Sequence, residues 1–195
     1  MHFNIPNCLT VFRVVAIPLI VLAYYSGLEY RHWIAGILFG LAGISDALDG
    51  YYARKLNQTS KLGEFLDPVA DKLLVSVMLV LVATNLELQS KLLFPLLFIL
   101  AVIVIISREI TVSALREWMA ELGQRSNVAV STVGKYKTGF QMTALGCLIF
   151  AKPLFGLPIL MIGEISLYVA ALLTIWSMSI YLTAAYKTLK ETQTS

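Results

Sequence analysis

Six apolar segments occupy most of this chain, and they restrict its fold more than any other feature. A helix that crosses the hydrocarbon core of a bilayer needs about 20 consecutive, mostly apolar residues. The segments that meet this requirement are residues 8–27, 33–53, 65–86, 92–112, 137–155 and 160–183. The sequence therefore predicts an all-α membrane protein with six transmembrane helices.

The composition of the chain supports lipid as the solvent of these segments. Charged residues account for 14% of the 195 residues and hydrophobic residues for 58%, whereas an average soluble domain carries about 25% charged residues. A soluble protein of this length would have to bury six almost uniformly apolar helices, so we exclude that class. The length predicts one domain over residues 1–195, and the net charge of +3 is too small to indicate nucleic acid binding.

Most Lys and Arg residues lie at or beside one end of the predicted bundle. The connections at the other end, near residues 28–32, 86–91 and 152–159, contribute only three of the fifteen. Those three are Arg31, Lys91 and Lys152. Because positively charged flanks of transmembrane helices stay on the cytoplasmic side, we expect both termini to be cytoplasmic. The connections at 54–64 and 117–136 should lie on the same side.

Four aspartates, the only ones in the chain, fall within 26 residues at the predicted cytoplasmic ends of the second and third spans. They are Asp46, Asp49, Asp67 and Asp71. A carboxylate within a membrane helix is costly unless it is paired or solvated, so such residues are candidates for function. On an α-helix the first two, with Gly50 and Ala53, occupy an arc of about 100°. The last two, with Gly63, occupy an arc of about 80°.

Two helices joined by a short turn would bring these two pairs of carboxylates to a common site. Four facing carboxylates repel one another unless cations lie between them, and oxygen-only ligation suits hard ions such as Mg²⁺ or Mn²⁺. Two such ions close together form a known clamp for in-line displacement at phosphorus. The sequence therefore predicts a site in which four aspartates hold two divalent metals.

Small residues and one arginine accompany the aspartates. Gly50, Ala53 and Gly63 would let a bulky ligand approach the helix backbone closely, and the planar fork of Arg54 suits phosphate oxygens. An alternative interpretation treats the acids as ordinary charges at a membrane boundary and the glycines as helix-packing residues. That interpretation does not explain why pairs of like charge face each other.

The spacing of these residues resembles the signature of the CDP-alcohol phosphotransferase family. The match runs Asp46-x2-Asp49-Gly50-x2-Ala53-Arg54-x8-Gly63-x3-Asp67-x3-Asp71 and includes every fixed position of that signature. Three further stretches fit the same family, namely Asn4-Ile5-Pro6-Asn7-x2-Thr10-x2-Arg13, Arg108-Glu109 and Gly134-Lys135-x-Lys137-Thr138. Residues 113–121 resemble the bacterial branch of the family whose acceptor is glycerol 3-phosphate.

The resemblance implies a six-span homodimer in the bacterial inner membrane, with a polar cavity that opens to the cytoplasm. It implies transfer of the phosphatidyl group of CDP-diacylglycerol to sn-glycerol 3-phosphate, giving phosphatidylglycerophosphate and CMP. Asp46 and Asp67 would each bridge two Mg²⁺ or Mn²⁺ ions. Asp49 would bind the first ion, and Asp71 would bind the second and act as general base on the acceptor hydroxyl.

The resemblance also assigns residues to CDP-diacylglycerol. Thr10 and Arg13 would close over its diphosphate, and Ala53 and Gly63 would leave room for its cytidine. The full set implied for this substrate is Thr10, Arg13, Gly50, Ala53, Arg54, Ser60 and Gly63.

Basic residues cluster at the predicted cytoplasmic ends of the fourth and fifth spans. They are Arg108, Arg116, Lys135 and Lys137. We interpret them as a pocket for the phosphate of an anionic acceptor, which glycerol 3-phosphate provides and a neutral alcohol does not. The alternative is that they anchor the cytoplasmic side of the bundle or extend from it toward water.

Three other functions share part of this pattern. The same chemistry with inositol phosphate, serine or phosphatidylglycerol as acceptor would require only a different acceptor pocket. An intramembrane prenyltransferase also pairs acidic motifs around Mg²⁺ and diphosphate, but such motifs usually lack the accompanying Gly50, Ala53 and Arg54. A cation transporter would place its carboxylates near the bilayer midplane on interrupted, repeated helices, whereas these acids lie toward one end and no repeat is visible.

Overall fold

The computed structural model of the chain describes residues 5–56, 61–121, 132–153 and 156–193. The regular structure of this part is entirely α-helical, as predicted. The seven helices are α1 Ile5–Tyr25, α2 Arg31–Leu56, α3 Lys61–Ala83, α4 Leu86–Gln89, α5 Pro95–Glu121, α6 Thr132–Phe150 and α7 Ile159–Gln193. Each predicted apolar segment overlaps one of the six long helices. The short helix α4, which Asn85 caps by accepting a hydrogen bond from the Leu88 N–H, was not predicted.

Three of the six predicted spans are confirmed as long and apolar enough to cross a membrane. These stretches are Asn7–Tyr25 in α1, Pro95–Glu121 in α5 and Ile159–Thr183 in α7. Each of the three exposes a large apolar side chain on its outer surface, exemplified by Leu22, Leu96 and Leu172. Within the described residues, α2, α3 and α6 do not meet the same criterion, and they carry the predicted aspartates and part of the basic cluster.

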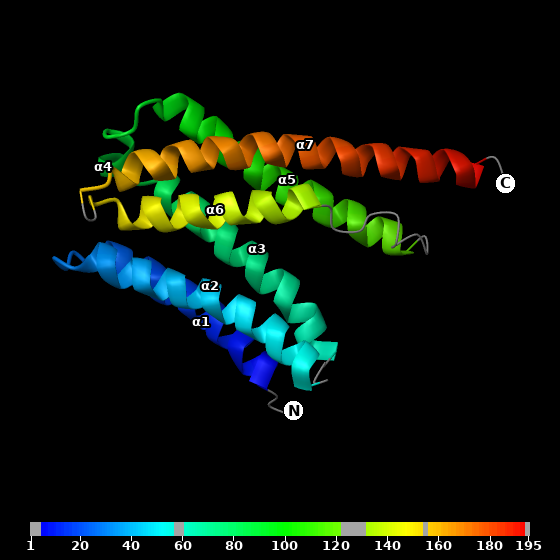
Figure 1. Cartoon of the computed structure of the whole chain (residues 1–195), viewed down its shortest axis with the longest axis horizontal. Helices are drawn as coiled ribbons and strands as arrows, with labels where there is room; N and C mark the ends of the chain where they lie inside the picture. Colours follow the sequence, from blue (N-terminus) through cyan, green and yellow to red (C-terminus); the bar gives the residue numbers. More distant parts are fainter. Residues whose placement is uncertain (1–4, 57–60, 122–131, 154–155, 194–195) are drawn as a thin grey trace.

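The long helices form two antiparallel pairs with α3 between them (Figure 1). Helix α1 packs along α2, and α6 packs along α7. Helix α3 contacts α1 on one side and α5 and α6 on the other, while α5 also packs against α7. The beginning of α1 and the end of α7 lie on the same side of the molecule, opposite the α1–α2 turn and α4 (Figure 1).

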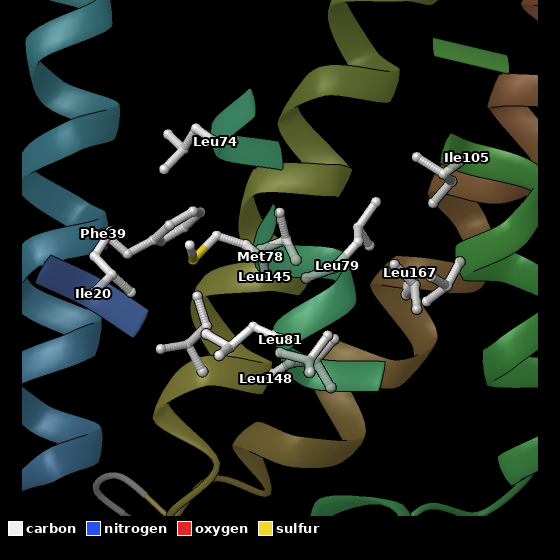
Figure 2. Close-up of a cluster of buried hydrophobic side chains, with 14 of the residues drawn as sticks. Ile20, Phe39, Leu74, Met78, Leu79, Leu81, Ile105, Leu145, Leu148 and Leu167 are labelled. Atoms are coloured by element: carbon white, nitrogen blue, oxygen red, sulfur yellow. The ribbon is translucent and has the colours of Figure 1, made fainter. Parts of the chain in front are cut away.

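A core of aliphatic and aromatic side chains joins these pairs. Met78 and Leu79 of α3 lie at its centre and are fully buried. Figure 2 shows Phe39 of α2 and Leu145 of α6 beside them, with Leu167 of α7 on the far side. Because interiors of this kind are close-packed, the core fixes α3 relative to the helices on both sides.

A buried carboxylate joins α7 to the beginning of α5. Glu164 is 1% exposed, and it accepts hydrogen bonds from the backbone N–H groups of Leu93 and Phe94, at 3.0 and 2.9 Å, and from the Tyr168 hydroxyl, at 2.5 Å. Leu93 and Phe94 immediately precede Pro95, the first residue of α5, and negative charge near a helix N-terminus is stabilising. Glu164 of α7 therefore supplies hydrogen-bond acceptors to the backbone at the beginning of α5.

We predict that Glu164→Gln lowers the thermal unfolding temperature of the detergent-solubilised protein. The substitution replaces one accepting oxygen by an NH₂ group among buried donors, which costs about 1–3 kcal/mol. The matched control is Glu87→Gln at the same end of the molecule. Glu87 is exposed and pairs with Arg31 and Lys91, and exposed ion pairs contribute little. Equal unfolding temperatures for the two variants would contradict the role of Glu164.

Candidate active site

Arg13 of α1 lies between the aspartates of α2 and α3. Its side chain is fully buried, and its two terminal nitrogens donate hydrogen bonds to Asp71 and Asp49. Its Nη2 also forms an ion pair with Asp46 Oδ1 at 3.2 Å. A single guanidinium therefore joins three of the four predicted aspartates, which come from two different helices.

Thr10 engages the fourth aspartate. It lies one turn before Arg13 on the same face of α1, is fully buried, and donates a hydrogen bond from its hydroxyl to Asp67. The structure thus brings all four predicted aspartates together with Thr10 and Arg13, the two α1 residues predicted to act with them.

The carboxylates differ in their access to solvent. The side chain of Asp49 is 7% exposed, whereas those of Asp46 and Asp71 are 52% and 48% exposed. The cluster is therefore closed on the side of Asp49 and open on the side of Asp46 and Asp71. A ligand can reach the carboxylates from that open side.

The donor set of this cluster fits divalent cations. Within the described residues, no three acidic, histidine or cysteine side chains are already gathered around a common metal position, because the Arg13 guanidinium lies among the carboxylates. Four ionised carboxylates and one guanidinium leave three negative charges, and hard divalent cations bind through oxygens of this kind. Metal ligation at this cluster therefore requires Arg13 to release part of its contacts.

The remaining residues predicted to bind the nucleotide lie close to the cluster along the chain. Gly50, Ala53 and Arg54 are in the last two turns of α2, and Gly63 is buried near the beginning of α3. The side chains of Ala53 and Arg54, and the whole of Ser60, fall outside the described part of the chain.

A cavity of about 350 Å³ adjoins the carboxylate cluster, bounded by α3, α5, α6 and α7. Asp71 forms part of its wall, as do the predicted acceptor residues Arg108, Arg116 and Lys137. The fourth predicted residue, Lys135, is exposed and does not line the cavity. Because Lys135 lies two residues before Lys137, the two side chains are about 160° apart around the helix, and only Lys137 faces the cavity.

Glu109 organises the basic residues of the cavity. Its Oε1 accepts a hydrogen bond from Lys137 and lies 3.2 Å from Arg108 Nη1. The cavity is lined by four cations and two carboxylates, which leave two net positive charges; the cations are Lys72, Arg108, Arg116 and Lys137, and the carboxylates are Asp71 and Glu109. The Nε atoms of both arginines are buried without a hydrogen-bond partner among the described residues. The cavity therefore offers unused donors and positive charge to an anion.

Helix α7 supplies residues that were not predicted from the sequence. The Ser177 hydroxyl accepts a hydrogen bond from Arg108 Nη2 at 3.0 Å, and the Tyr181 hydroxyl accepts one from Arg116 Nη2 at 2.5 Å. The Tyr181 ring centroid lies 5.6 Å from Arg108 Cζ and 4.9 Å from Arg116 Cζ, within the range of cation–π attraction. The spacing of Ser177 and Tyr181 by four residues in an apolar span was the available signal of one polar helix face.

Comparison with known proteins identifies the family. Residues 3–176 match the family described as CDP-alcohol phosphatidyltransferase. A CDP-diacylglycerol–glycerol-3-phosphate 3-phosphatidyltransferase of Haemophilus influenzae is 49% identical over 185 residues, which cover 95% of each chain. Proteins of the same name from Shigella flexneri serotype 5b and Escherichia coli strain K12 are each 45% identical over 95% of this chain and 96% of their own.

The matched region contains the whole carboxylate cluster, the cations of the cavity, and Thr10 and Arg13. On the extent of this match and on the identity to these relatives, the chain belongs to the CDP-alcohol phosphatidyltransferase family.

Proposed function

We propose that this protein transfers the phosphatidyl group of CDP-diacylglycerol to sn-glycerol 3-phosphate, giving phosphatidylglycerophosphate and CMP. The relatives named for this reaction support the proposal. The observation that carries it is the cavity, because Asp71 of the acidic cluster and a group of cations line the same space. An acceptor with a phosphate at one end and a hydroxyl at the other fits this arrangement of charge.

Divalent cations complete the acidic cluster in this proposal. Asp46, Asp49, Asp67 and Asp71 would hold two Mg²⁺ or Mn²⁺ ions. Bound there, the ions would neutralise the diphosphate and so stabilise the charge that develops at phosphorus. The excess of three negative charges over Arg13 and the oxygen-only donors support this assignment.

The α1 residues and the last turns of α2 would bind CDP-diacylglycerol. Arg13, once released from some of the carboxylates, would contact the diphosphate together with Thr10 and Arg54. Gly50, Ala53 and Gly63 would leave room for the cytidine, and Ser60 would contact the same substrate. The position of Gly63 on α3, one turn before Asp67, supports its place beside the cluster.

The reaction is an in-line displacement at the phosphorus that bears diacylglycerol. The acceptor hydroxyl oxygen forms a bond to this phosphorus, the bond from phosphorus to the CMP oxygen breaks, and CMP leaves with its electron pair. Asp71 accepts the proton of the attacking hydroxyl. Its position on the wall of the cation-lined cavity supports this role, because a general base must reach the proton that it removes.

The phosphate of the acceptor would bind to Arg108, Arg116 and Lys137. Two net positive charges in the cavity match a phosphate dianion, and the unpaired Nε atoms of the arginines provide donors for its oxygens. Lys135, which is exposed, would add only long-range attraction. Serine carries only a singly charged carboxylate next to an ammonium group, so it matches two net positive charges less well than a phosphate dianion does.

The membrane topology belongs to the same proposal. We propose that all six long helices span the bacterial inner membrane and that both termini and the active site face the cytoplasm. The basic residues beside the site support this orientation. The homodimer remains a proposal from the family resemblance.

The decisive test measures CMP release from CDP-diacylglycerol by the purified protein. We expect release with sn-glycerol 3-phosphate, and little with serine, inositol phosphate or phosphatidylglycerol. Removal of divalent ions with EDTA should stop the reaction, and added Mg²⁺ should restore it, because the carboxylates need cations to bind a diphosphate. Equal release with serine, or full activity in EDTA, would overturn the proposal.

We predict that Asp71→Asn reduces CMP release by at least about a thousandfold while the protein still binds CDP-diacylglycerol. An amide can accept a hydrogen bond but cannot take up the proton, and general bases contribute about 10²–10⁴-fold to rates. The control Glu87→Gln makes the equivalent change at an exposed ion pair on α4. Near-normal turnover of Asp71→Asn would exclude it as the base.

Two lysines of α6 allow a matched test of the acceptor pocket. We predict that Lys137→Ala raises the KM for glycerol 3-phosphate at least tenfold, because a buried cation contributes about 1.5–3 kcal/mol in a charged hydrogen bond. Lys135→Ala should change KM much less, since this side chain is exposed. Equal effects of the two substitutions on KM would show that the lysines act only through general surface charge.

A further inference from the structure

One uncharged side chain of the cavity wall has a buried polar atom without a hydrogen-bond partner among the described residues. Gln141 of α6 lies one turn beyond Lys137 on the same helix face, is 3% exposed and lines the cavity. No described residue donates a hydrogen bond to its side-chain oxygen, Oε1. Buried carbonyl oxygens are nearly always hydrogen-bonded, so an unpaired one beside a ligand cavity requires an explanation.

The other uncharged polar groups of the cavity wall are already engaged. The Thr138 hydroxyl donates a hydrogen bond to the Gly134 carbonyl at 3.0 Å, and the Tyr181 hydroxyl accepts one from Arg116. On α3, the uncharged wall residues Pro68 and Val75 are apolar. Among the uncharged side chains that line the cavity, Gln141 is therefore the one with a buried polar atom that has no hydrogen-bond partner within the described residues.

We propose that the Gln141 side-chain carbonyl accepts a hydrogen bond from the second, non-reacting hydroxyl of the acceptor, and that it selects acceptors which carry this hydroxyl. The inference rests on the proposed function, because it takes the cavity as the acceptor site. It assigns to Gln141 a specificity role that is separate from phosphate binding and from proton removal.

The arrangement of the cavity supports this assignment. An acceptor held by its phosphate at the cations and by its reacting hydroxyl at Asp71 is fixed at both ends. The middle carbon of a three-carbon acceptor then lies between these two ends, and its hydroxyl must meet a wall of the cavity. The Gln141 carbonyl can form a hydrogen bond with the bound substrate only if the substrate provides a donor, and the middle hydroxyl is such a donor.

The chemical consequence is discrimination against acceptors without this group. A site that is built to bond a substrate hydroxyl rejects an analogue that lacks it, since the polar group of the site is then left unpaired. Two analogues of glycerol 3-phosphate separate the effect of losing the hydrogen bond from the effect of losing the volume of the hydroxyl. In 3-hydroxypropyl phosphate the middle hydroxyl is replaced by hydrogen, and in 2-fluoro-3-hydroxypropyl phosphate it is replaced by fluorine, which has similar size but cannot donate.

The first experiment compares these acceptors with the unaltered protein. We expect kcat/KM for each analogue to fall at least about tenfold below the value for sn-glycerol 3-phosphate, because one buried hydrogen bond is lost. Equal kcat/KM for the fluoro analogue and glycerol 3-phosphate would overturn the inference, since donation by the hydroxyl would then be unimportant. This comparison needs no variant and does not depend on how a substitution affects folding.

The second experiment uses Gln141→Met, which keeps the length of the side chain and removes the carbonyl. We expect kcat/KM for glycerol 3-phosphate to fall about tenfold, while the value for 3-hydroxypropyl phosphate stays within about twofold, so that the preference disappears. An equal fall for both acceptors, or an unchanged preference, would overturn the inference. Absence of any CMP release with glycerol 3-phosphate in the unaltered protein would instead overturn the proposed function itself.

Discussion

The buried guanidinium of Arg13 is the interaction on which the arrangement of this end of the bundle depends. Four carboxylates brought together by α2 and α3 would repel one another strongly in a region of low dielectric constant. Arg13 and Thr10 reach them from a third helix, α1, and make their close approach possible. These contacts therefore join the first three helices. They also hold together the carboxylates that a divalent cation would bind.

The polar end of the molecule has two regions of opposite charge that meet at Asp71. One region is the acidic cluster around Arg13, and the other is the cation-lined cavity organised by Glu109 and Tyr181. Each region contains a residue of the opposite sign that limits internal repulsion. In the proposed reaction, this division would let a polyanionic lipid nucleotide and an anionic acceptor bind next to each other without sharing the same charges.

The sequence predicted the six long helices, the four aspartates and most of the basic cluster, because helical spacing shows which residues share a face. It predicted that the two aspartate pairs meet, but it did not predict which side chains of other helices form hydrogen bonds or ion pairs with them. Nothing in the spacing indicates that Arg13 contacts Asp46, Asp49 and Asp71. Nor does it indicate that Glu109 lies between Arg108 and Lys137. Gln141, Ser177 and Tyr181 were missed because isolated polar residues in an apolar span do not reveal whether they face lipid or a cavity. Lys135 was grouped with Lys137 by proximity in sequence, although two residues on a helix point to different sides.

Glu164 has a consequence for how an acceptor could enter. It fastens α7 to the beginning of α5 at one end, and Ser177, thirteen residues further along, fastens the same two helices through Arg108. The two attachments are about 20 Å apart along α7, so α5 and α7 are held together at two separate levels of the bundle. An acceptor that enters the cavity therefore meets walls held together by direct contacts, because α6 is also joined to α5 through Lys137 and Glu109 and packs along α7.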